Sequence, residues 1–244
     1  SLAAFRAVAW HSTKQGNVLE SADVANAYLN ALWPDKHATH FPRLDKNTYD
    51  LCSDELKKKI DSMGGWQNVV LPMRRCLYGH PISGFIWIQL LHDWLIAHGF
   101  ATVPGTPALY QRGNVIACVY VDDLAAAGPQ AQVQELWDSL RKEWDLRETG
   151  TCTEFLGIRV SYQPHQHGTE VMLDMEDYCR EIGRTYDEHF PEHKTVPRYV
   201  PMTQEQEAKL ATQDSKPASV PQKRVMKLVG QVLWVTRCAR AETA

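Results

Sequence analysis

The sequence predicts an α+β fold in which an antiparallel sheet is backed by helices. Two apolar segments, 108–111 and 115–121, flank the tight turn Arg112-Gly113-Asn114, a pattern typical of a β-hairpin. Segments 85–97 and 129–144 place apolar residues at spacings of three and four, which is typical of helices covering one face of a sheet. With 244 residues, 44% of them apolar, the chain can bury a core of ordinary size.

The sequence pattern predicts fewer helices and strands in the N-terminal part of the chain than in the rest. Apolar residues at helical spacing predict a short helix over 2–14 that ends at Gly16, and the next apolar run predicts a strand over 18–24. Prolines and glycines then interrupt the pattern as far as residue 75, apart from a lysine-rich surface helix at 54–60.

The middle of the chain carries the clearest patterns. Helix 85–97 is expected to end at Gly99, the usual glycine position after a helix. Strand 115–121 is nearly all apolar and rich in β-branched residues, so we expect both of its faces to be covered. It leads into Asp122-Asp123, and Pro129 begins the next helix.

The C-terminal part predicts a second hairpin, from segments 154–162 and 169–175, and a helix over 176–189. Five prolines in 191–221 predict an extended, proline-rich connector. A last helix is expected over 222–237.

Composition limits the environment and the partners. Six scattered cysteines without a C-x-x-C pair predict reduced thiols and an intracellular location, cytoplasmic or nuclear. We expect no signal peptide and no membrane partner, because no apolar stretch has the required length or flanks. The net charge of -3 by itself argues against a nucleic-acid partner, since such proteins usually carry a basic surplus.

Two adjacent acids at the end of an apolar strand are the most informative feature. Asp122 and Asp123 fit an ordinary polar turn, but carboxylates beside a buried strand must be solvated, paired or metal-bound. Asp23 also ends a predicted strand, which can lie beside them. Such a trio suits two Mg²⁺ ions, because Mg²⁺ takes carboxylate and phosphate oxygens.

Five segments in the same order resemble motifs of the reverse transcriptase of copia-type retrotransposon polyproteins. They are Asp23-Val-Ala-Asn-Ala-Tyr-Leu-Asn, Cys76-Leu-Tyr-Gly79 followed by Trp87, Tyr120-Val-Asp-Asp123, Phe155-Leu-Gly-Ile158 and Leu228-Val-Gly-Gln-Val-Leu-Trp-Val-Thr-Arg237. The resemblance implies a polymerase palm-like sheet and RNA-templated DNA synthesis by two-metal nucleotidyl transfer. The implied partners are an RNA or DNA template with primer, deoxynucleotide triphosphates and other parts of the parent polyprotein.

The resemblance also implies residue roles. Asp23 and Asp122 would bind catalytic magnesium, and Asp123 in the same turn would belong to the same catalytic and metal-binding group with a less direct role. Three further residues would bind nucleotide: Tyr28, Gly79 and Tyr120. The ring of Tyr28 falls where an aromatic residue excludes a ribose 2′-hydroxyl, although plain core packing is the other interpretation of this tyrosine.

Two departures from the family pattern matter. Residues 80–84 read His-Pro-Ile-Ser-Gly where the family usually has Leu-Lys-Gln-Ala-Pro, so the glutamine that helps to seat the base pair is not at its place. The basic fingers hairpin that precedes the first motif in the family has no counterpart in the 22 residues before Asp23. We therefore expect a fragment with its fingers largely missing, which polymerises poorly alone.

The expected organisation is a palm-like domain over 1–190, a connector over 191–221 and the start of the connection towards RNase H over 222–244. Two other functions stay open. A catalytically inactive retroelement remnant would act only as a nucleic-acid or protein binding module, which the net charge of -3 favours. Another palm-type enzyme, such as a nucleotidyl cyclase, shares two-metal chemistry but does not explain the ordered motifs.

Overall fold

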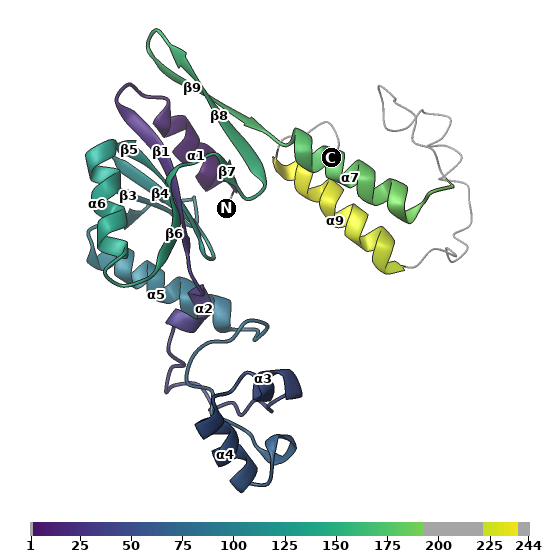
Figure 1. Ribbon diagram of the computed structural model, residues 1–244. Coiled ribbons are helices and arrows are strands. Elements are labelled where there is room, and N and C mark those ends of the chain that lie inside the picture. Colours follow the sequence, from purple (N-terminus) through teal and green to yellow (C-terminus); the bar gives the residue numbers. More distant parts are fainter. Residues whose placement is uncertain (1, 193–221, 239–244) are drawn as a thin grey trace.

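A computed structural model describes residues 2–192 and 222–238, which form a mixed α+β fold (Figure 1). Six strands form an antiparallel sheet in the order β2-β3-β4-β5-β1-β6, and three more form a second sheet in the order β7-β8-β9. The helices are α1 (Leu2–Ser12), α2 (Ala27–Asn30), α3 (Lys46–Asp50), α4 (Asp54–Ser62), the short 3-10 helix η1 (Trp66–Asn68), α5 (Ser83–Ala97), α6 (Gln130–Leu140), α7 (Glu176–His189) and α9 (Gln222–Cys238). The strands are β1 (Asn17–Val24), β2 (Ala101–Thr102), β3 (Leu109–Arg112), β4 (Val115–Tyr120), β5 (Asp123–Pro129), β6 (Leu146–Thr151), β7 (Glu154–Phe155), β8 (Ile158–His165) and β9 (Gly168–Asp174).

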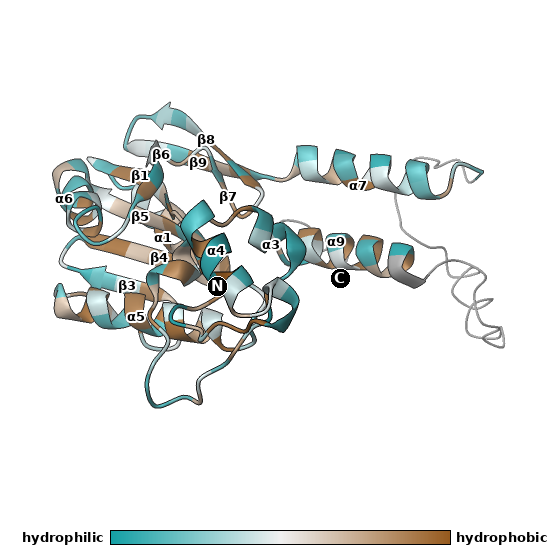
Figure 2. Cartoon of the chain, turned by 60° about the horizontal axis from the view of Figure 1, so that its bottom comes forward, coloured by the Kyte–Doolittle hydropathy of each residue, from teal (hydrophilic) through white to brown (hydrophobic). Residues whose placement is uncertain are grey.

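The central strands are buried on both faces, as their apolar sequence predicts. Val115, Ala117 and Val119 of β4 belong to the hydrophobic cluster formed with α5 and α6, whereas Cys118 belongs to the cluster formed with α1. Successive side chains of a strand point to opposite faces, so β4 contributes to both clusters. Hydrophobic colour is correspondingly concentrated on α1, α5 and these strands in Figure 2.

Helices cover the two faces of the large sheet unequally. On one face, α5 contributes the buried side chains of Trp87, Leu91 and Leu95, and α6 adds its own apolar stripe. On the other face lies α1, where Phe5 stacks on Phe155 of the second sheet with ring centroids 4.5 Å apart. This arrangement confirms the expected antiparallel sheet backed by two helices, which are α5 and the shorter α6.

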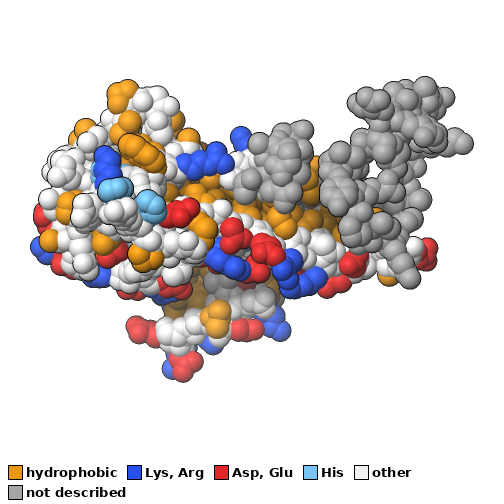
Figure 3. All heavy atoms as spheres, turned by 90° about the horizontal axis from the view of Figure 1, so that it is seen from above, with side chains coloured by type: hydrophobic (Ala, Val, Ile, Leu, Met, Phe, Trp, Pro, Cys, Tyr) orange, Lys and Arg blue, Asp and Glu red, His pale blue; other side chains and the backbone are white. Residues whose placement is uncertain are grey.

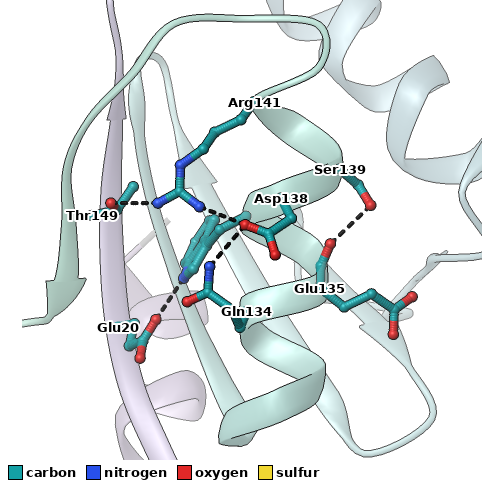
Figure 4. Close-up of polar contacts among 8 residues, drawn as sticks. Glu20, Gln134, Glu135, Asp138, Ser139, Arg141 and Thr149 are labelled. Atoms are coloured by element: carbon teal, nitrogen blue, oxygen red, sulfur yellow. Dashed lines mark hydrogen bonds and ion pairs between the residues drawn. The ribbon is translucent and has the colours of Figure 1, made fainter.

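Polar contacts of α6 fix the edge of the large sheet (Figure 4). The indole Nε1 of Trp137 donates to the Glu20 carboxylate of β1 at 2.8 Å. Arg141 donates to the hydroxyl of Thr149 in β6 at 2.6 Å and to the carboxylate of Asp138 at 2.8 Å. Helix α6 and the Arg141 that follows it therefore hold both β1, which carries Asp23, and its neighbour β6.

The remaining helices extend from this body. α7 and α9 pack side by side (Figure 1). The guanidinium of Arg6 in α1 donates to the carbonyl oxygen of Cys238 at 2.7 Å, and Val235 is buried in the α1 cluster. A cation at a helix C-terminus satisfies its free carbonyls, so this contact anchors α9. Within the described ranges, no helix combines the length and apolar character needed to cross a membrane.

Four details correct or extend the sequence expectations. Helix α6 ends at Leu140, so Trp144 packs against the core from beyond the helix rather than in its stripe. Val121 leaves the predicted strand and lies in the turn, with φ of 60°. Strand β6 was not expected, because its exposed, charged residues carry no apolar alternation. From residue 193 onwards the predicted connector 191–221 lies outside the described residues, as do residues 239–244.

Candidate functional site

A row of four side chains crosses the end of the large sheet. Asp23 of β1 lies directly opposite Asp123 of β5, and Asp123 lies directly opposite Tyr120 of β4. Arg147 of β6 is the partner of Asp23 on its other side. Directly opposed residues of antiparallel strands share a face, with Cβ atoms about 4.5–5.5 Å apart. The structure thus brings Asp23, Asp123 and Tyr120 together, although Asp23 and the Asp122-Asp123 pair are far apart in the sequence.

Asp122 lies in the turn between β4 and β5. Its carbonyl oxygen accepts a hydrogen bond from the backbone N–H of Val24 at 2.9 Å, which ties the turn to β1. The preceding Val121 has the left-handed conformation, which is strained for a β-branched residue. Its carbonyl oxygen accepts from the indole Nε1 of the fully buried Trp87 at 2.6 Å. Hydrogen bonds from two elements therefore hold the strained turn in place.

Burial and the neighbouring carboxylates raise the pKa values of Asp23 and Asp123. Burial raises the pKa of Asp23 above its ordinary value, and the negative charge of Asp122 raises it further. Burial raises the pKa of Asp123 to about 6, with smaller contributions from the charges of Asp122 and Asp23. Arg147 opposes the shift only at Asp23. The charge of Arg147 therefore offsets only part of the shift at Asp23.

The structure adds Glu148, which sequence reasoning missed. Its charge raises the pKa of both Asp23 and Asp123. The register between β1 and β6 shifts between Ser21 and Asp23, and Glu148 adopts a φ of 50° within this bulge. Bulges redirect a side chain locally, and their position depends on strand pairing. The sequence around Glu148 carries no clear local signal of this geometry.

Two tyrosines lie beside the carboxylates. Tyr28 of α2 stacks on Tyr78, with ring centroids 4.6 Å apart and an angle of 22° between the rings. Burial raises the pKa of Tyr78, and the negative charge of Asp122 adds to this shift. Gly79 follows in an open turn with φ of 85°. Tyr78 was not among the predicted site residues, although it lies inside the Leu-Tyr-Gly motif.

The donor chemistry of this site suits Mg²⁺, although the carboxylates do not form a closed metal cage. Among the described residues, no group of three His, Cys, Asp or Glu side chains is arranged to hold a metal ion. Mg²⁺ usually takes only one or two protein carboxylates and completes its shell with water and substrate phosphates. Burial and then mutual repulsion raise the pKa values of Asp23 and Asp123, and a cation at the same place would relieve the repulsion.

The surface has two further features. A cavity of about 520 Å³ lies between the end of α2, helix α5 and Trp144, and none of the three aspartates lines this cavity. On the face shown in Figure 3, acidic and basic side chains are interspersed rather than separated into large areas of one sign. This face therefore offers no extended basic surface to a polyanion.

Comparison with known proteins agrees with the family that the motifs resemble. Residues 58–202 match the model of the family described as reverse transcriptase (RNA-dependent DNA polymerase). Over 108 residues, 42% of the chain, it is 28% identical to a Saccharomyces cerevisiae protein named "Putative transposon Ty5-1 protein". Over 181 residues, 70% of the chain, it is 23% identical to the Transposon Ty1-BL Gag-Pol polyprotein of the same yeast. The aligned parts span 34% and 10% of these two relatives.

Proposed function

The chain belongs to the reverse transcriptase (RNA-dependent DNA polymerase) family, and we propose that it performs RNA-templated DNA synthesis as part of a retrotransposon polyprotein. In this proposal residues 1–190 are a palm-like domain, 191–221 a connector and 222–244 the start of the connection towards RNase H. Its partners are a primed RNA or DNA template, deoxynucleotide triphosphates and the rest of the polyprotein, in the cytoplasm or nucleus.

One observation carries the proposal: Asp23 and Asp123 lie opposite each other on β1 and β5, beside the turn that holds Asp122. Asp23 and Asp122 would hold magnesium, with Asp123 in support. Bound there, the metal would activate the primer hydroxyl and stabilise the leaving phosphate oxygens. The hydrogen bonds of the turn to Trp87 and Val24 keep the Asp122 backbone fixed, so little reorganisation is needed when substrate binds.

The surrounding residues would receive the nucleotide. Tyr28 would exclude a ribose 2′-hydroxyl with its ring, and the partly exposed Tyr120 and the open turn at Gly79 would contact the nucleotide. The stack of Tyr28 on Tyr78 limits the freedom of the Tyr28 ring and supports a steric role.

Primer extension on poly(rA) primed with oligo(dT), with dTTP and Mg²⁺, tests this function. We expect weak extension by the wild-type chain and a loss of at least about 100-fold in the Asp122→Asn variant, because electrostatic and metal contributions of this kind are worth several kcal/mol. Asp187→Asn, an exposed aspartate on α7, is the matched control and should extend like wild type. Equal signals from wild type and Asp122→Asn would refute the catalytic proposal.

The second candidate function is a catalytically inactive module that binds nucleic acid or a protein. Ile82 stands where the family usually has glutamine, which favours this alternative. It predicts no extension by wild type, together with retention of the primed poly(rA) in a gel-shift measurement. The same retention is expected from Asp122→Asn, because binding of this kind does not need the carboxylate.

A further inference from the structure

The backbone of α5 approaches Tyr28 unusually closely at Gly84. A Cβ placed on Gly84 would lie 2.9 Å from the hydroxyl oxygen of Tyr28 and 3.4 Å from its Cζ. Real Cβ atoms essentially never show a contact under 3.0 Å, so any side chain at this position forces the tip of the Tyr28 ring to move. The observed ring position requires a glycine.

Tyr78 holds the same ring by stacking on it, with centroids 4.6 Å apart. The segment that carries Tyr78 is tied to the start of α5, because the backbone N–H of Leu77 donates to the hydroxyl of the fully buried Ser83 at 3.1 Å. One short segment of α5, residues 83–84, therefore fixes Tyr28 by direct contact and through Tyr78.

This tyrosine pair also lies near the carboxylates. The charges of Asp122 and Asp23 both raise the pKa of Tyr78, after the larger effect of burial. A shift of the Tyr28 ring would therefore occur next to Asp23 and Asp122, the groups proposed to bind the metal.

We propose that Gly84 is a positioning residue that determines nucleotide selectivity, because it allows the Tyr28 ring to lie against the first turn of α5. This inference rests on the proposed function, in which Tyr28 collides with the 2′-hydroxyl of a ribonucleotide. A group excludes a substrate well only when its own position is fixed to within a few tenths of an ångström.

Four proteins test the inference: wild type, Gly84→Ala, Tyr28→Phe and the double variant. Isothermal titration with dATP and with ATP gives the ratio of the two Kd values. Each titration contains Mg²⁺ and a poly(dT) template whose primer ends in a dideoxynucleotide, so that no extension consumes the nucleotide. We expect Gly84→Ala to reduce the preference for dATP over ATP by at least about threefold. The displaced Tyr28 ring would no longer collide fully with the 2′-hydroxyl of ATP.

The tyrosine hydroxyl provides the diagnostic comparison. In the Tyr28→Phe background the 2.9 Å contact disappears and only the tolerable 3.4 Å contact to Cζ remains. Adding Gly84→Ala to Tyr28→Phe should therefore leave the ratio unchanged. Gly183→Ala on α7, where an added Cβ would meet no atom of the described chain within 4 Å, is the matched control and should keep the wild-type ratio.

The outcomes separate the inference from the function on which it rests. A preference for dATP that Gly84→Ala lowers only in the presence of the Tyr28 hydroxyl supports both. A wild-type preference that Gly84→Ala leaves intact, or lowers equally in the Tyr28→Phe background, overturns the inference alone. Equal binding of dATP and ATP by wild type, or no binding of either, overturns the inference together with the proposed role of Tyr28.

Discussion

The hydrogen bond from Trp87 to the turn of the aspartates leads to a quantitative prediction. The indole Nε1 of Trp87 donates to the carbonyl oxygen of Val121 at 2.6 Å, and the ring packs edge-on against Trp144 with centroids 5.3 Å apart. Trp87→Phe removes the donor and part of the ring but keeps an aromatic side chain in the core. The strained turn at Val121 then loses one of its two hydrogen-bonded supports.

The size of the effect follows from these contacts. Removing the donor leaves a part-buried carbonyl without its partner, which costs about 1–2 kcal/mol. Weakening the aromatic pair adds up to about 1 kcal/mol, and the smaller ring leaves a cavity in a fully buried position. We expect Trp87→Phe to lower the free energy of unfolding by about 2–4 kcal/mol in total.

Urea denaturation followed by far-UV circular dichroism measures this loss, with Trp94→Phe as the control. The Nε1 atom of Trp94 is buried but has no hydrogen-bond partner among the described residues. Its removal therefore relieves an unsatisfied donor, although the stack of Trp94 on His98 is weakened. The control should change the free energy of unfolding by less than about 1 kcal/mol.

The comparison of the two variants shows whether the hydrogen bond or the lost side-chain volume causes the destabilisation. If Trp94→Phe destabilises the chain as much as Trp87→Phe, tryptophan volume rather than the hydrogen bond dominates. A loss below about 1 kcal/mol for Trp87→Phe would show that the turn does not depend on this donor.

Two further predictions concern the aspartates and one glycine. Because the pKa of Asp123 is raised to about 6, the folded chain binds this proton more tightly than the unfolded chain, and stability falls as the pH rises from about 4 to about 6. Asp123→Asn should therefore be more stable than wild type at pH 7.5 in EDTA and equally stable below pH 4 in urea denaturation; equal stabilities at pH 7.5 would contradict the shift. Gly168→Ala should destabilise by more than about 2 kcal/mol in the same assay, because its Cβ would overlap the backbone carbonyl oxygen of Thr13 and φ is 153°. Gly183→Ala should stay within about 1 kcal/mol of wild type, and a similar result for Gly168→Ala would show that the backbone there adjusts freely.

The sequence by itself determined the elements whose signal is local. Hydrophobic spacing over 85–97 and the glycine turn at residues 112–114 predicted α5 and the β3–β4 hairpin to within two residues, because periodicity and turn chemistry act between near neighbours. The ordered motifs also identified the family, which the match over residues 58–202 confirmed.

Only the tertiary structure decided which side chains meet. The opposition of Asp23 and Asp123 depends on the register of β1 and β5, and the approach of Glu148 depends on a bulge in an exposed strand without apolar alternation. The closeness of Gly84 to Tyr28 depends on how α2 packs against α5. These contacts join residues that are distant in the sequence. Burial and strand pairing across the whole fold determine them, so no local sequence pattern reveals them.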